Sequence, residues 1–221
     1  MKPKLLLALF FLFSVLLACR NAEIQKFEEV NGFAALPVTK NGERVATFAG
    51  GCFWAMQECM IQLKGVKTVI SGYAGGDVVR PTYEEVLQGN TGHAEAVQVY
   101  YDPNVISFER LAEAFFHAHD PTQLNRQGPD IGTDYRSIAF YRNKEEYQTL
   151  VGMRKLLDST TYKHGIVTAF QQLTQFYPAE MEHQDYYKRN NWDPYIRHVS
   201  KPKVLKLQKA MPAMIKSAYL E

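Results

Sequence analysis

Cys52 and its surroundings are the part of this sequence that most directly indicates chemistry. Cys52 follows Gly50-Gly51 and begins a stretch in which apolar residues recur with helical spacing. Its thiol is therefore expected at a helix amino terminus, where free backbone N–H groups and the helix dipole favour a thiolate. A thiolate there would be a nucleophile. The alternative is a buried cysteine that fills space behind Gly51, and position alone leaves both interpretations open.

Glu95 is the second candidate. It lies in Ala94–Tyr101, whose composition predicts a strand, and the period of two puts it on the same face as Val97 and Val99. If that face points to the core, loss of solvent raises the pKa of Glu95 and makes it an acid that can give up a proton near neutral pH. The alternative is a residue at the strand end that bends out to solvent.

Phe53 and Trp54 follow the cysteine directly and can either wall a site or fill a core. A thiolate beside a protonated carboxyl group, enclosed by aromatic rings, suits attack on an atom whose leaving oxygen must be protonated. Sulfoxides fit that description.

The elements that must position these residues are short and alternate between strand-like and helix-like patterns. Strands are predicted at 45–49, 66–73, 94–101, 137–141 and 166–170, and helices from 52 to just before Gly65, at 81–87, from Ser107 onward and at 144–157. Strand, helix and strand follow one another twice. The pattern predicts an α+β fold, a two-layer ferredoxin-like α/β sandwich with a βαββαβ core and additional C-terminal elements.

Composition is that of a globular protein. The chain has 221 residues, 46% of them hydrophobic and 22% charged, which predicts one domain with a substantial core. A formal net charge of +2 argues against an electrostatic nucleic-acid partner. Three scattered cysteines are too few for a disulfide framework or a four-cysteine zinc site, and no metal or other cofactor is expected.

The amino terminus has the features of an export signal. Lys2 and Lys4 precede an apolar run that ends at Cys19, and the run is shorter than the ~20 residues of a membrane-spanning helix. The segment 16–19 resembles the lipobox of bacterial lipoproteins, which implies a diacylated Cys19 and an extracytoplasmic, membrane-anchored protein. An uncleaved signal anchor, or a signal in which Cys19 is incidental, are the alternatives. We expect a signal peptide at 1–18, a tether at 19–43, the catalytic domain at 44–198 and a C-terminal extension at 199–221.

Several separate blocks carry a resemblance to one known family. They are Gly51-Cys52-Phe53-Trp54, Gly72-Tyr73-Ala74-Gly75-Gly76, Pro81 to Val86, Gly92 to Val97, His119 to Gln123 and Gly132 to Ser137. In this order they resemble the peptide methionine sulfoxide reductase A family, from about Ala46 to His198. The resemblance implies reduction of methionine S-sulfoxide, free or in oxidised proteins, and so a role in protein repair under oxidative stress.

The resemblance also implies roles for individual residues. Cys52 would be the nucleophile and Glu95 the acid, with Tyr83 and Tyr135 hydrogen-bonded to the sulfoxide oxygen. Phe53 and Trp54 would hold the substrate methyl group, and Asp130 and His183 match pocket positions near the substrate main chain. Cys52 would end each turnover as a sulfenic acid, the first reversible step of cysteine oxidation.

Recycling is where this sequence departs from its relatives. Many relatives carry a resolving cysteine after a tyrosine near the carboxyl terminus, whereas here Tyr195 is followed by Ile196 and no cysteine follows Cys59. Cys59 lies seven residues after Cys52, about 10.5 Å along a helix, beyond the ~7 Å Cα limit for a disulfide. We therefore expect Cys59 in the core, an external thioredoxin-like reductant, and a monomeric enzyme.

Two further classes of function compete with this interpretation. A Cys–His hydrolase would use His93, His119 or His183 as the base for Cys52, but needs no Glu95. A non-catalytic lipoprotein could bind peptides through the aromatic pocket. The segment His117-Ala118-His119-Asp120 faintly resembles a metal cluster, although a capped, solvated helix end is the preferred interpretation.

Overall fold

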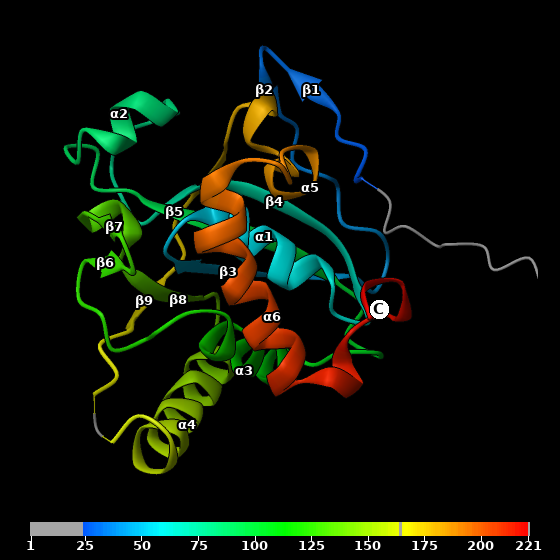
Figure 1. Ribbon diagram of the computed structural model, residues 1–221, viewed down its shortest axis with the longest axis vertical. Coiled ribbons are helices and arrows are strands. Elements are labelled where there is room, and N and C mark those ends of the chain that lie inside the picture. The colour runs from blue at the N-terminus through cyan, green and yellow to red at the C-terminus, as the bar shows by residue number, and fades with distance from the viewer. Residues whose placement is uncertain (1–23, 164, 221) are drawn as a thin grey trace, which may run out of the picture.

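The computed structural model describes residues 24–163 and 165–220 (Figure 1). The predicted signal peptide and Cys19 lie outside the described residues. Within the described part of the chain, no helix is long and apolar enough to cross a membrane.

A six-stranded sheet forms the centre of the molecule, with the strand order β10-β4-β5-β3-β8-β9. Its strands are β3 (Arg44–Gly50), β4 (Val66–Ala74), β5 (Ala94–Tyr101), β8 (Ser137–Tyr141), β9 (Ala169–Gln172) and β10 (Phe176–Pro178). Neighbouring strands run antiparallel except β8 and β9, which are parallel. The α+β class predicted from the sequence is confirmed.

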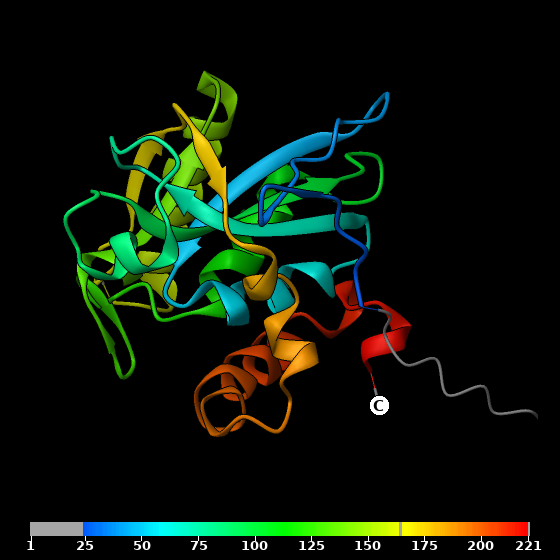
Figure 2. The same cartoon turned by 90° about the horizontal axis from the view of Figure 1, so that it is seen from above.

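Helices cover one face of this sheet in two layers. The longer helices are α1 (Phe53–Ile61), α3 (Phe108–Ala118), α4 (Lys144–Thr160) and α6 (Lys201–Ala210). Helices α1 and α3 pack on the sheet and on each other, and α6 lies over both, on the side away from the sheet (Figures 1 and 2). The carboxyl-terminal part of the chain therefore closes over the helix that begins beside Cys52.

Local sequence explains where the helices begin. Thr82 caps α2 (Tyr83–Leu87) and forms a capping box with Glu85, which leaves Pro81 outside the helix. Ser107 caps α3 by accepting a hydrogen bond from the Arg110 amide. The fifth predicted strand begins at Ala169 instead of 166, because it pairs with β8 from that residue onward.

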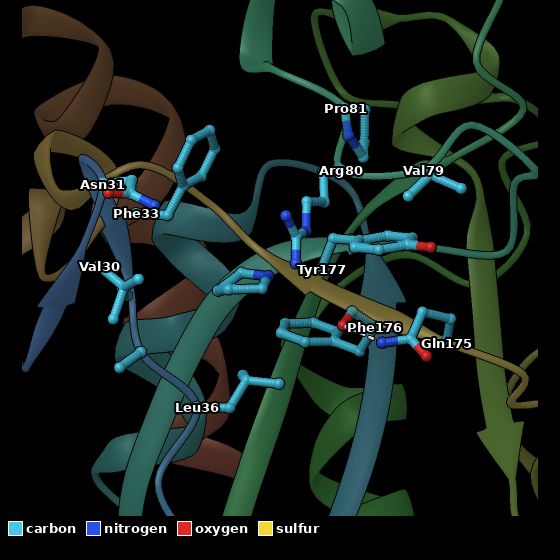
Figure 3. A pocket seen from close by; sticks show the side chains of 13 residues that line it. Val30, Asn31, Phe33, Leu36, Val79, Arg80, Pro81, Gln175, Phe176 and Tyr177 are labelled. Atoms are coloured by element: carbon cyan, nitrogen blue, oxygen red, sulfur yellow. Dashed lines mark hydrogen bonds between the residues drawn. The ribbon is translucent and has the colours of Figure 1, made fainter.

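The opposite face of the sheet is covered by the segment before β3. Strands β1 (Glu29–Val30) and β2 (Phe33–Ala34) form a hairpin, and Ala34 is buried in an apolar cluster with residues of the central strands. The described residues 24–43, expected as part of a tether, therefore include a packed hairpin. A groove of about 640 Å³ lies between this hairpin, residues 79–81 and the edge strand β10 (Figure 3).

Candidate active site

Cys52 lies at the amino-terminal end of α1, as predicted, where it is the residue that precedes the first helical turn. The chain reaches it through Gly51, whose φ of +83° is in the region that favours glycine. A Cβ atom at Gly51 would lie 2.5 Å from side-chain carbons of Gln127. Both constraints explain why glycine precedes the cysteine.

The Cys52 thiol is almost fully buried, with 5% of the residue exposed. Burial, and next the negative charge of Glu95, raise the pKa of Cys52 above its usual value. A hydrogen bond with Tyr195, the backbone amide of Trp54 and the charge of Lys203 act in the opposite direction. The expectation that Cys52 holds a thiolate more easily than an exposed thiol is therefore wrong, because burial and the Glu95 charge raise its pKa more than the hydrogen bonds and the Lys203 charge lower it.

Glu95 is buried beside the same helix end, with 1% of the residue exposed. Its Oε2 accepts a hydrogen bond of 2.9 Å from the Phe53 amide, the first backbone donor of α1. Burial raises the pKa of Glu95 to about 8, although the Phe53 amide lowers it. The prediction of a buried acid is confirmed, and the alternative of a side chain bent out to solvent is wrong.

Two phenols share this environment. The pKa values of Tyr83 and Tyr135 are raised by burial and next by the charge of Glu95, and Cys52 contributes to both shifts. The two hydroxyl groups thus remain protonated hydrogen-bond donors around the acid and the thiol. Tyr83 enters from the start of α2, where its amide donates to Glu180 Oε1 at 2.9 Å.

Aromatic rings form one wall. The Phe53 ring stacks on Tyr83 with centroids 6.2 Å apart, and Trp54 stacks on Tyr186 at 3.8 Å. His183 is buried against this wall, 4.2 Å from the Tyr83 centroid. Burial lowers the pKa of His183, so its ring is neutral near pH 7. The predicted pocket residues Phe53, Trp54 and His183 therefore lie together.

The Asp130 carboxylate is contacted by Tyr195 and Lys203. Tyr195 Oη donates a hydrogen bond of 2.6 Å to Asp130 Oδ2, and the same hydroxyl is a hydrogen-bond partner of Cys52. Lys203 Nζ lies 3.8 Å from the same carboxylate oxygen. The sequence reasoning gave no role to Tyr195 or Lys203, although Tyr195 was singled out as the residue before the missing cysteine.

Glu180 was also not given a role. Its carboxylate accepts hydrogen bonds of 2.9 Å from the Tyr83 amide and from Tyr73 Oη. It therefore fixes the start of α2 relative to β4. A single glutamate in a loop gives no pattern that would indicate this function from the sequence.

The other histidines have partners of their own. His119 Nε2 lies 2.7 Å from Ser137 Oγ and its Nδ1 lies 2.7 Å from the Phe115 carbonyl oxygen. His93 Nδ1 accepts from the Gly76 amide. The hydrolase alternative therefore has no base from either residue. His119 is 1% exposed, so the interpretation of its helix end as solvated is wrong.

Cys59 is fully buried and lies in the apolar core cluster. Cys52 and Cys59 are both free thiols. The prediction that Cys59 is a core residue is confirmed. Among the residues that the structure describes, no group of three or more His, Cys, Asp or Glu side chains could hold a metal ion.

Comparisons with known proteins agree with this geometry. Residues 44–214 match the family model described as peptide methionine sulfoxide reductase. Peptide methionine sulfoxide reductase MsrA of Natronomonas pharaonis is 46% identical over 173 residues, which is 78% of this chain and 97% of the relative. The corresponding protein of Haloquadratum walsbyi is 49% identical over 74% of this chain and 93% of the relative. The crystal structure of reduced Mxr1 from Saccharomyces cerevisiae has a TM-score of 0.67 and 31% identity, over 71% of this chain and 91% of that one.

Proposed function

Since this chain belongs to the peptide methionine sulfoxide reductase family, it reduces methionine sulfoxide to methionine at the expense of a thiol, and we propose that Cys52 and Glu95 carry the reaction. Cys52 is the nucleophile and Glu95 the acid. Tyr83 and Tyr135 donate hydrogen bonds to the sulfoxide oxygen. Phe53 and Trp54 hold the methyl group of the substrate, which is the S epimer.

The first step transfers oxygen from the substrate to Cys52. The Cys52 sulfur attacks the sulfoxide sulfur and forms an S–S bond, while Glu95 gives a proton to the sulfoxide oxygen and takes up the proton of the thiol. The S–O bond then breaks, and the oxygen, as hydroxide, attacks the Cys52 sulfur. The S–S bond breaks in turn and leaves its electron pair on the methionine sulfur. Methionine is released with its sulfur reduced by two electrons, and Cys52 is oxidised to a sulfenic acid. The raised pKa of Glu95, about 8, supports this step because the acid is protonated at neutral pH.

The second step regenerates the thiol. One thiol of an external reductant displaces water from the Cys52 sulfenic acid, and a second thiol then attacks the mixed disulfide and releases Cys52. A thioredoxin-like protein is the proposed donor. The proposal is supported by the burial of Cys59, away from the site, and by the solved complex of Mxr1 from Saccharomyces cerevisiae with Trx2.

The observation that carries the assignment is the meeting of Cys52 and Glu95 at one helix terminus. Cys52 precedes α1, and the Phe53 amide, one residue later, binds the Glu95 carboxyl group. A buried acid that is hydrogen-bonded to the residue after a buried thiol fits a proton donor and a nucleophile that act on the same S–O bond. Asp130 and His183 border this position and are proposed to contact the substrate main chain.

A single-turnover assay tests the reaction. Purified enzyme is mixed with each epimer of a methionine sulfoxide peptide, with and without dithiothreitol, and methionine is quantified. We expect about one methionine per enzyme without dithiothreitol and continuous turnover with it, on the S epimer only. Absence of methionine in both arms would favour a non-catalytic peptide-binding module.

We also infer a ferredoxin-like core for the fold. The inference is supported by the strand order β8-β3-β5-β4, with every neighbouring pair antiparallel, and by the helices α1 and α3 that connect β3 to β4 and β5 toward β8. Such a core needs only short connections between neighbouring elements.

Finally, we propose that the protein is an extracytoplasmic lipoprotein, a monomer anchored to the membrane through Cys19. The proposal is supported by the resemblance of residues 16–19 to a lipobox and by the apolar run that precedes it. Diacylation together with a further acyl chain at the new amino group would give stable attachment.

A further inference from the structure

Lys203 is a buried cation beside the active site. It belongs to the first turn of α6, and its side chain is 14% exposed. Its Nζ atom is buried and has no hydrogen-bond partner among the described residues. The nearest opposite charge is Asp130 Oδ2, 3.8 Å away, in a side chain that is 11% exposed. A lysine ammonium group is strongly hydrated, so this placement costs solvation energy.

A short chain of contacts connects this ammonium group to the nucleophile. Asp130 accepts the hydrogen bond of Tyr195, whose hydroxyl also contacts Cys52. From the other side, Lys203 Nζ lies 3.7 Å from the position that a Cβ atom would occupy at Gly51, the residue before Cys52. Two separate observations therefore place the Lys203 ammonium group near the Cys52 thiol.

The charges around the thiol explain what a cation does there. The titratable groups that interact with Cys52 or with its neighbours Glu95 and Tyr195 are Glu95, Asp130, Asp134, Tyr73, Tyr83, Tyr135, Tyr186, Tyr195 and Lys203. Three of them are carboxyl groups, each of which disfavours a further negative charge when it is ionised. Attack requires that charge on sulfur, so a nearby positive charge stabilises the reactive form.

We propose that Lys203 is a positioning residue for the reduction of methionine sulfoxide: its ammonium group neutralises Asp130 and, through Tyr195, allows the Cys52 thiolate to form beside three carboxyl groups. This inference rests on the role proposed above for Cys52. It also gives α6 a function in addition to packing. An apolar side chain could fill the same space beside α1 without the cost of burying an ammonium group.

The test compares wild-type protein with Lys203→Met, Lys203→Arg and Lys206→Met. Methionine keeps most of the length of the lysine side chain and removes its charge, whereas arginine keeps the charge. Lys206 is the matched control, because it lies one turn later on α6 and its Nζ binds the His119 carbonyl oxygen at 2.8 Å. Each protein is alkylated with iodoacetamide from pH 6 to 10, and peptide mapping follows Cys52 separately from the other cysteines.

We expect Lys203→Met to slow alkylation of Cys52 at neutral pH about tenfold, which corresponds to one pKa unit. The rate of methionine formation in a single turnover should fall by a similar factor, while the dissociation constant for substrate changes little. Lys203→Arg should retain most of the wild-type rate, and Lys206→Met should match wild type in its alkylation profile. An unchanged alkylation profile in Lys203→Met would overturn the proposal.

A second variant separates charge from loss of packing. In an Asp130→Asn background the carboxylate that Lys203 neutralises is absent, so adding Lys203→Met should shift the alkylation profile less than it does in wild type. Equal shifts in both backgrounds would contradict the route through Asp130. Alkylation needs no sulfoxide, so this result stands even if the reductase assay fails, and the two proposals can fail separately.

Discussion

At Cys52, the helix terminus and burial have opposite effects on the ionisation of the thiol. The end of α1 offers backbone donors and a positive dipole, yet burial removes the water that would solvate a thiolate. The first of those donors, the Phe53 amide, binds Glu95. The thiol and the carboxyl group are therefore both neutral near pH 7, because the pKa values of both are raised.

Replacement of each cysteine in turn should distinguish the roles of Cys52 and Cys59. We expect Cys52→Ser to abolish methionine formation, because a hydroxyl group is a far weaker nucleophile than a thiol. Cys59→Ser should retain most turnover and lower the free energy of unfolding by about 1–3 kcal/mol, because a hydroxyl group is buried in an apolar site. Turnover by the Cys52 variant would contradict the mechanism. The measurements are the single-turnover assay and urea denaturation.

Replacement of the acid should change the pH dependence as well as the rate. Attack needs the Cys52 thiolate, whose fraction grows with pH because the pKa of the thiol is raised, whereas Glu95 acts only while protonated. The first-turnover rate should therefore rise with pH and level off near pH 8, because the pKa of Glu95 is about 8. Glu95→Gln should be slower by about 10²–10⁴-fold, and its rate should go on rising with pH without levelling off near pH 8, because an amide does not titrate. Rapid-quench measurements from pH 6 to 10 test this. A variant with the wild-type rate would remove Glu95 from the role of acid.

At the scale of elements, α1 separates the two thiols. Cys52 lies at its amino-terminal end and Cys59 inside its last turns, facing the core. A disulfide between them would require the helix to unwind, because seven helical residues rise about 10.5 Å. Unwinding would also displace the Phe53 amide and break its hydrogen bond to Glu95.

We therefore expect a sulfenic acid at Cys52 after one turnover without reductant, with no Cys52–Cys59 disulfide. Intact mass and dimedone trapping test this after oxidation with one equivalent of methionine sulfoxide. A dimedone adduct at Cys52 is the expected product. A loss of two hydrogens with an internal disulfide would show that α1 opens and that Cys59 acts as the resolving thiol. Cys59→Ser is the control, since it cannot form that bond.

The elements also show what the sequence could predict. The bounds of β5 and β8 agree with the apolar pattern, and Ser107 marks the start of α3, because alternation and capping are local properties. The period of two placed Glu95 on the face of Val97 and Val99 but left open whether its side chain is buried, and every residue of β5 is buried in the structure. Tyr195 and Lys203 could not be placed in this way. Both reach Asp130 only through tertiary packing, across 65 and 73 positions of the chain.

For the whole molecule, the raised pKa of Glu95 makes the free energy of unfolding depend on pH. Its pKa of about 8 lies above the ordinary 4.5, so folded protein keeps the proton while unfolded protein loses it. The stabilising contribution is complete below about pH 4.5 and is lost as the pH rises to about 8, by up to about 1.4 kcal/mol per pH unit. Glu95→Gln should therefore gain stability relative to wild type across this range, measured by urea denaturation.

Glu58 provides the control for this measurement. It is also buried, and desolvation raises its pKa to about 7. Glu58→Gln should also gain stability relative to wild type as the pH rises. Its gain should stop increasing near pH 7, about one pH unit below the limit for Glu95→Gln. A constant difference between wild type and Glu95→Gln from pH 4.5 to 8 would show that Glu95 ionises normally in the folded protein.

The proposed anchor concerns the position of the whole enzyme. Gln25 Nε2 donates a hydrogen bond of 2.7 Å to Asp185 Oδ1, so the chain is bound to the catalytic domain six residues after Cys19. Six residues span at most about 22 Å, even when fully extended. A lipidated Cys19 would therefore hold the catalytic domain close to the membrane surface, within reach of membrane-associated proteins.

Cys19→Ala tests this arrangement. The variant should incorporate no labelled fatty acid and leave the membrane fraction, because the proposed acylation requires the cysteine. Its single-turnover rate on a soluble sulfoxide peptide should equal that of wild type, because Cys19 takes no part in the proposed chemistry. Cys59→Ser is the matched control, since it also removes a thiol but should keep both the label and the membrane association. Wild-type protein that incorporates no fatty acid would exclude the lipid anchor, and it would leave the reductase mechanism unaffected.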